Sequence, residues 1–222
     1  MIVKKEDLVK KLFILIFTIP FILINAQKIG EIAKEKPRIQ FPNNSLGMDI
    51  MIGEGGFGFG GFYRYAFSIP LTGFIDFSIS ESKNEREIER YDIFGRPLPI
   101  IGKKNRVFLL PLNFGVQYRM FYESLTDNLR PYINFGVGPT MLVTSPAQEE
   151  FFKSFGKAKS KFGLGGYVGL GANIGSHPNN LVGINIRYFL AKTFDDGIEQ
   201  YYGDVRNTFG QVYLTINIGI MY

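Results

Sequence analysis

The sequence predicts an all-β protein: an eight-stranded antiparallel up-and-down transmembrane β-barrel. Three observations predict it. Apolar and polar or small residues alternate with a period of two along most of the chain after residue 46, which is typical of strands with one apolar face. The connections between these segments are mostly long and short in turn, as in membrane barrels. Glycine and aromatic residues are both abundant, with 26 Gly, 22 Phe and 12 Tyr among 222 residues.

The first 26 residues have the pattern of a secretory signal peptide. Lysines near the start precede an apolar run, Leu12–Ala26, which ends in a small residue before a polar segment. A membrane anchor is the alternative, but the run is shorter than the ~20 residues of a spanning helix and contains Pro20. We therefore expect cleavage after Ala26. Residues 27–45 are polar, contain two prolines and are expected to form a periplasmic linker.

Residues 46–222 are expected to form the barrel, because they carry eight alternating segments. The clearest is the last, Gln211–Tyr222, in which the even positions are all apolar or aromatic. The other seven lie at 47–52, 57–68, 75–80, 108–120, 132–141, 162–174 and 182–191. The long connections are 81–106, 145–160 and 195–207, and the short ones are 69–72, 123–130 and 175–180. The first connection, Gly53–Gly56, breaks this rule because it is tight although it falls at the long-loop end.

The face that lies outside distinguishes a soluble barrel from a membrane barrel. A lipocalin-like barrel points its apolar face inward, whereas a membrane barrel points it to lipid. The apolar faces here are too bulky for the interior of an eight-stranded barrel, and the opposite faces are rich in glycine. The sequence therefore predicts apolar faces toward lipid and a narrow polar lumen. Aromatic girdles are expected at both lipid–water interfaces, with Phe108 in the girdle near the long loops.

Charged residues of both signs fall on the predicted lumen faces. They are Asp49, Arg64, Asp76, Arg119 and Arg187. Enclosed charges need partners, because burying an unpaired charge is strongly unfavourable. We predict a polar network that fills the lumen, without assigning pairs. The alternative is that some of these residues lie in water near the ends of the barrel.

The remaining motifs do not point to catalysis. Without cysteine, the chain cannot form disulfides, Cys-ligated zinc sites or iron–sulfur clusters, and a net charge of +5 does not suggest a nucleic-acid partner. Gly53–Gly58 matches the dinucleotide fingerprint, but a strand follows it instead of a helix, so a hairpin turn is expected. His177 is next to Ser176 in a short turn opposite the long loops, a poor arrangement for a nucleophile and base. We predict no catalytic residue, cofactor or metal ligand.

The chain resembles small bacterial outer-membrane β-barrel proteins of the eight-stranded OmpA/OmpX type. The last strand carries the most specific part of this resemblance: a terminal aromatic residue preceded by apolar residues at alternate positions. These residues are Leu214, Ile216, Ile218, Ile220 and Tyr222. In that family such a strand is the signal read by the barrel-assembly machinery. The resemblance implies a location in the cell outer membrane, with outer-membrane lipid and this machinery as partners.

The sequence favours a non-enzymatic envelope protein with a structural or surface-interaction role. The charged segment 83–105 and the phenylalanines at 151, 152 and 155 are candidates for an outward binding surface, although nothing in them names a ligand. A narrow channel or carrier for small molecules is the alternative. The resemblance alone adds a third hypothesis, an accessory barrel of an envelope secretion system.

Overall fold

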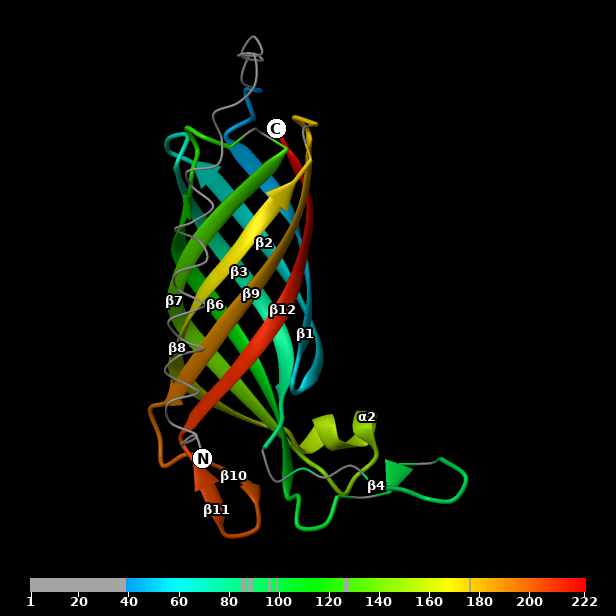
Figure 1. The fold of residues 1–222 in the computed structure, drawn as a ribbon. Coiled ribbons are helices and arrows are strands. Elements are labelled where there is room, and N and C mark those ends of the chain that lie inside the picture. The colour runs from blue at the N-terminus through cyan, green and yellow to red at the C-terminus, as the bar shows by residue number, and fades with distance from the viewer. Residues whose placement is uncertain are drawn as a thin grey trace, which may run out of the picture. The chain divides into compact units, whose positions relative to one another are not determined.

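The structure is a computed structural model that describes residues 39–84, 87, 90–95, 97–98, 100–125, 128–175 and 177–222. Within these residues, eight strands form a closed antiparallel barrel in the order β1-β12-β9-β8-β7-β6-β3-β2 (Figure 1). The predicted fold class is therefore confirmed. The predicted signal peptide, residues 1–26, and most of the predicted linker lie outside the described residues.

Each barrel strand pairs with the strands before and after it along the wall, and the last strand closes on the first. The strands are β1 Asn44–Gly53, β2 Gly56–Ala66, β3 Leu71–Ser82, β6 Asn105–Arg119, β7 Leu129–Pro146, β8 Lys159–Ile174, β9 Asn180–Thr193 and β12 Thr208–Met221. In the closing pair, Leu46 lies opposite Ile220 and Ile52 lies opposite Leu214. Strand β1 begins at Asn44, two residues before the barrel start expected from the sequence.

The two ends of the barrel differ in the length of their connections. Short turns join β2 to β3, β6 to β7 and β8 to β9 at the end where β1 starts and β12 finishes, at the top of Figure 1. We call this the turn end. The opposite end, which we call the loop end, carries the tight β1–β2 turn and the long connections.

The long connections contain elements that the two-residue alternation does not predict. They are β4 Arg90–Tyr91 paired with β5 Pro97–Leu98, the helix α2 Phe151–Ser154 followed by the 3-10 turn η1 Phe155–Lys157, and β10 Ile198–Tyr201 paired with β11 Asp204–Arg206. No helix in the described part of the chain is long and apolar enough to cross a membrane.

The two faces of the strands differ sharply in burial. On β12, Ile218 is 50% exposed, whereas its neighbour Asn217 is completely buried. The same contrast occurs on β1, where Met48 is exposed and the next residue, Asp49, is buried. Apolar side chains thus cover the outside of the barrel, while polar side chains and buried aromatic ones line the inside. An apolar outer face is the arrangement of a membrane barrel and the reverse of a soluble one.

Glycine allows close contact between strands in the barrel wall. A Cβ atom on Gly138 of β7 would lie 1.8 Å from the carbonyl oxygen of Leu112 on β6. The two strands are paired on both sides of this point, with Pro111 opposite Thr140 and Phe114 opposite Val137. Only a residue without a side chain fits here without moving the backbone.

Candidate functional site

The lumen contains a buried ion cluster made by residues of three strands. Arg187 on β9 donates from Nη2 to Oδ2 of Asp49 on β1 at 2.9 Å, and its Nη1 lies 3.8 Å from Oδ2 of Asp76 on β3. All three side chains are at most 4% exposed. The guanidinium also lies 4.8 Å from the ring centroid of Tyr167. One cation therefore interacts with two carboxylates at a site that is almost completely shielded from solvent.

Neutral side chains donate further hydrogen bonds to both carboxylates. Asn113 donates from Nδ2 to Oδ1 of Asp76 at 2.9 Å, and the Tyr167 hydroxyl donates to Oδ2 at 2.5 Å. The Asn217 amide donates to Oδ1 of Asp49. Each carboxylate thus accepts hydrogen bonds in addition to its interaction with Arg187, as buried charges require.

A chain of amide and hydroxyl groups extends this cluster. Asn217 also accepts a 3.1 Å hydrogen bond from the Tyr132 hydroxyl, and Asn185 donates to Tyr132 at 3.2 Å and to Asn134 at 3.3 Å. The sequence indicates Asp49 as a lumen charge, but it does not indicate the roles of these neutral residues. Their position on the same strand faces as the charged residues was the signal that could have found them.

Aromatic rings fill much of the remaining lumen. The rings of Phe74 and Tyr167 stack with centroids 5.9 Å apart, and the hydroxyls of Tyr213 and Ser80 are 2.7 Å apart. A cavity beside Arg187, lined in part by Tyr167 and Tyr213, has a volume of about 10 Å³. Because a water molecule needs ~10–15 Å³ of such space, this part of the lumen accommodates at most one.

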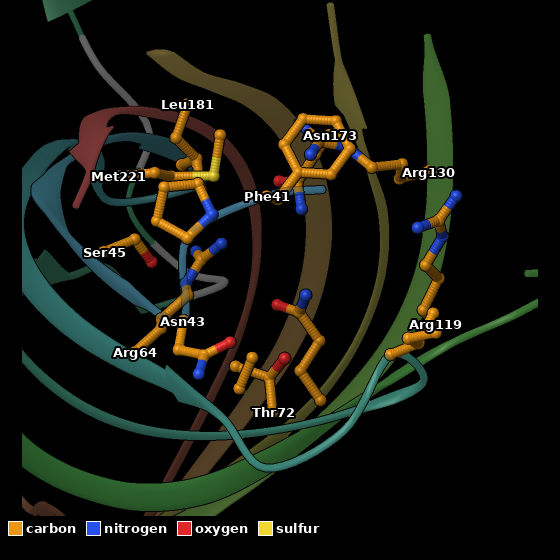
Figure 2. A pocket seen from close by; sticks show the side chains of 14 residues that line it. Phe41, Asn43, Ser45, Arg64, Thr72, Arg119, Arg130, Asn173, Leu181 and Met221 are labelled. Atoms are coloured by element: carbon orange, nitrogen blue, oxygen red, sulfur yellow. The ribbon is translucent and has the colours of Figure 1, made fainter. Parts of the chain in front are cut away.

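The five charged residues expected to form one network lie in two places in the lumen. Asp49, Asp76 and Arg187 lie together, whereas Arg64 and Arg119 line a different pocket at the turn end (Figure 2). Residues that share the inner face of a barrel lie at different heights, and these two belong to the turn-end parts of β2 and β6. That Arg64 and Arg119 belong to the same polar network as this cluster stays a prediction.

Contacts between loops form a buried polar cluster at the loop end. Lys103 Nζ lies 2.8 Å from Oε2 of Glu87 and 3.5 Å from Oε1 of Glu81. Gln200 of β10 donates to the carbonyl of Ser82 at 2.9 Å and to Oε1 of Glu87 at 3.3 Å. Lys103 and Gln200 are both buried. These bonds join the β3–β6 connection to the β9–β12 connection across the barrel mouth.

A more exposed ion pair strengthens the same junction. The Lys104 ammonium donates to the Glu199 carboxylate, and the Lys104 N–H donates to the Gln200 carbonyl at 2.8 Å. Hydrogen bonds from Lys104 and from the Gly203 N–H lower the pKa of the Glu199 carboxyl below its usual value. The pair is therefore retained at mildly acidic pH and is lost only when the pH falls through this lowered pKa.

The helix α2 and the turn η1 cover an aromatic side chain that the sequence placed at the lipid interface. Phe108 on β6 is 8% exposed, because its ring lies 5.6 Å from the ring of Phe155 and 6.2 Å from that of Phe151. The prediction that Phe108 forms part of an exposed girdle is therefore wrong. Phe152, at the same site, is 83% exposed.

The glycine-rich segment that matches the dinucleotide fingerprint and the lone histidine both lie in or next to turns between strands. Residues 54–55 form the turn between β1 and β2, and the strand β2 follows at once. His177 is exposed, and its Nδ1 accepts a hydrogen bond from the Asn179 N–H at 3.3 Å; Ser176 is outside the described residues. Across the described ranges, no group of three or more His, Asp or Glu side chains is placed to hold a metal ion.

The sequence matches the family described as outer membrane protein beta-barrel domain over residues 37–220. The chain belongs to this family. The predicted location in the cell outer membrane is confirmed, and the apolar outer face of the barrel lies in outer-membrane lipid. No curated protein matches the chain.

Solved structures of other outer-membrane barrels are similar in fold. A major outer membrane protein from Thermus thermophilus is 14% identical, with a TM-score of 0.50, and the alignment covers 81% of this chain and 98% of that one. Ail, the attachment invasion locus protein of Yersinia pestis, is 14% identical with a TM-score of 0.42, covering 82% and 100%. The N-terminal β-barrel domain of Pseudomonas aeruginosa OprF is 13% identical with a TM-score of 0.44, covering 82% and 100%. At this identity the likeness concerns the fold alone.

Membership of this family predicts a direction for the barrel in the membrane. Outer-membrane barrels have short turns on the periplasmic side and longer loops outside. By this rule the turn end of the barrel, with the pocket that contains Arg64, is expected to face the periplasm. The loop end, with α2 and the two small hairpins, is expected to face the cell exterior.

The C-terminal strand of this outer-membrane barrel presents its apolar residues to lipid. Leu214, Ile218, Ile220 and Tyr222 are exposed on the outer face, and Ile216 is half-buried there. Backbone hydrogen bonds link Tyr222 to Asn44 in both directions, at 2.9 and 3.2 Å. The strand is thus the one that closes the barrel against β1.

Proposed function

We propose that this outer-membrane barrel is a non-enzymatic, non-conducting envelope protein with a structural or surface-interaction role. The observation that carries the proposal is the filled lumen. Arg187 and its two carboxylates span the interior between β1, β3 and β9, and aromatic rings occupy much of the space around them. An ion that crossed would have to displace this cluster.

Energetics favour a cluster that stays in place. Removing one member of a buried ion pair typically costs about 3–5 kcal/mol, because the other charge is left without compensation. Here Arg187 interacts with two carboxylates, so moving it would leave both Asp49 and Asp76 without a counter-ion. The loop-end cluster of Lys103 and Glu87 adds a second obstruction at the opposite side of the barrel from the turns.

The surface-interaction role is supported by exposed apolar side chains at the loop end. They are Ile93, Phe94, Ile101, Phe152, Phe194, Tyr202 and Val205. Apolar groups on loops that face the cell exterior are unfavourable in water unless a partner covers them, and such groups often mark interaction sites.

The proposal is tested by conductance of the purified protein in planar lipid bilayers. The wild-type protein is expected to show no steady conductance. The double variant Tyr167→Ala/Tyr213→Ala, which enlarges the lumen cavity, is expected to conduct. The matched control Tyr63→Ala/Tyr188→Ala removes two outward tyrosines and is expected to remain closed.

Reproducible single-channel steps from the wild-type protein would contradict the proposal and favour the alternative, a narrow channel or carrier. The third hypothesis, an accessory barrel of a secretion system, predicts a closed barrel that co-purifies with other envelope components. We also propose that the barrel-assembly machinery inserts the protein by reading its last strand.

A further inference from the structure

The turn end of the barrel contains a pocket that the filled lumen does not explain. It has a volume of about 100 Å³, and Figure 2 shows the side chains of Arg64, Arg119 and Arg130 around it. These arginines come from β2, β6 and β7, close to the ends of those strands that meet the periplasmic turns. Since ~10–15 Å³ suffices for one water, the pocket has room for a larger group.

The charge of this pocket is one-sided. The described residues that line it include three arginines, and there is no aspartate or glutamate among them. Two further buried side chains, Gln117 and Asn173, add amide groups, each of which carries an NH₂ donor. The lining therefore offers positive charge and hydrogen-bond donors, beside the unpartnered amide oxygens of Gln117 and Asn173, which can accept from a protonated oxygen of a bound group.

Arg64 indicates that a ligand is missing from this pocket. Arg64 is only 5% exposed, and its Nη1 has no hydrogen-bond partner among the described residues. No described carboxylate forms an ion pair with it, and its guanidinium instead lies over the ring of Phe62, 4.0 Å from the ring centroid. A buried guanidinium without an anion is unfavourable, and an anionic ligand would remove this penalty.

We propose that this pocket binds a phosphate group from the periplasm. Guanidinium groups bind phosphate through pairs of parallel N–H···O bonds. Arginines from three strands surround the pocket, so they approach a bound group from different directions, which suits a tetrahedral anion with several acceptor oxygens better than a planar carboxylate. The site lies at the open, periplasmic end, so a soluble phosphate reaches it without crossing the filled lumen.

The experiment is a calorimetric titration of inorganic phosphate into the full protein, purified in a non-ionic detergent at constant ionic strength, with chloride as the reference anion. Saturable binding of phosphate is expected for the wild-type protein. Arg64→Gln is expected to weaken it about tenfold or more, because charge-assisted hydrogen bonds are lost.

The matched control is Arg106→Gln, which removes the same charge from the loop end, where Arg106 donates to the carbonyls of Ala147 and Glu149. This control is expected to bind phosphate as the wild type does. Equal weakening by both variants, or no saturable binding at all, would overturn the proposal. If Arg64→Gln does not fold, Arg64→Lys, which keeps the charge and loses the bidentate geometry, takes its place with the same expected direction.

A second titration distinguishes the source of the phosphate. Short-chain phosphatidylglycerol replaces inorganic phosphate and offers the same group as part of a lipid. Binding of inorganic phosphate, with or without lipid binding, supports the proposal. Binding of the lipid alone would contradict it and would indicate a lipid headgroup site.

Discussion

At the scale of single residues, Arg187 has the largest predicted influence on stability. It is the cation shared by Asp49 and Asp76, which belong to strands far apart in the sequence. Because all three groups are buried, the loss of one member leaves the others without compensation.

We predict that Arg187→Met destabilises the barrel by about 3–5 kcal/mol, because two buried carboxylates lose their counter-ion. Urea unfolding of the protein in micelles measures this effect. The triple variant that adds Asp49→Asn and Asp76→Asn is expected to recover much of the loss, since the charges are then removed together. A triple variant as unstable as the single one would contradict the charge-based explanation.

We predict that Gly138→Ala destabilises the barrel by about 1–3 kcal/mol, the usual effect of overpacking. The new methyl group would meet the Leu112 carbonyl at 1.8 Å, and a backbone atom cannot turn aside as a side chain can. Gly61→Ala is the control, because its methyl group would come no closer than 3.7 Å to the Gly47 oxygen. The same urea unfolding experiment compares them, and equal stability of both variants would refute the prediction.

At the scale of elements, the α2–η1 segment is held against the barrel by aromatic contacts. Phe151 and Phe155 both pack on Phe108 and also on each other, with centroids 5.1 Å apart. The helix has only four residues, too few to be stable by itself. Packing against β6 is therefore what holds the segment in place.

We predict that Phe108→Ala releases this segment and speeds tryptic cleavage after Lys153 and Lys157. Such aromatic pairs contribute about 0.5–1.5 kcal/mol each beyond burial, so the change is expected to be several-fold. Phe57→Ala, at an exposed position near the same end, is expected to leave the cleavage rate unchanged. Comparable rates for wild type and Phe108→Ala would show that other contacts hold the segment.

The last strand supports a prediction about assembly. If Tyr222 is part of the signal that the assembly machinery reads, Tyr222→Ala should lower the amount of folded barrel in the outer membrane several-fold. The folded form is measured by its heat-dependent mobility on gels. Tyr202→Ala, which changes an exposed loop tyrosine, serves as the control. An unchanged yield of Tyr222→Ala would argue against this role.

At the scale of the whole molecule, the direction of the barrel decides what each end can do. The loop end presents exposed apolar side chains and long connections that are joined by hydrogen bonds. The turn end presents an arginine-lined pocket. If the loop end faces outward, the first surface meets the environment and the second meets the periplasm.

This direction is testable because the natural chain has no cysteine. We predict that Ile93→Cys at the loop end reacts with a membrane-impermeant maleimide on intact cells. Ile69→Cys, in the β2–β3 turn, is expected to react only after the outer membrane is permeabilised; both positions are exposed. Labelling with the opposite pattern would invert the assignment.

The architecture was predictable because strand geometry is local. Successive side chains of a strand point to opposite faces, so the outward position of Ile218 and the inward position of Asn217 follow from their places in the sequence. Exposed apolar faces that are this bulky fit lipid, and they do not fit the narrow interior of eight strands. The alternation of short and long connections also predicted that one end of the barrel carries short turns and the other long loops.

The partners within the lumen were not predictable in this way. Which inward residues meet depends on the tilt of the strands and on the relative shift of each strand pair around the closed wall. This shift brings Arg187 to Asp49 and Asp76, and keeps Arg64 and Arg119 at the turn end. Likewise, nothing in the alternation of β6 indicates that Phe108 is covered by a helix from another connection.

The sequence by itself determined the fold class, the two faces of each strand, the membrane location and the residues available to the lumen, because all of these depend on side-chain parity and hydrophobicity. Only the tertiary structure decided which charges are paired, that aromatic rings fill much of the lumen, and that three arginines line one pocket. The physical reason is that these contacts join side chains far apart in the chain, such as Asp49 and Arg187. Their distance in space is fixed only when the last strand closes the barrel on the first.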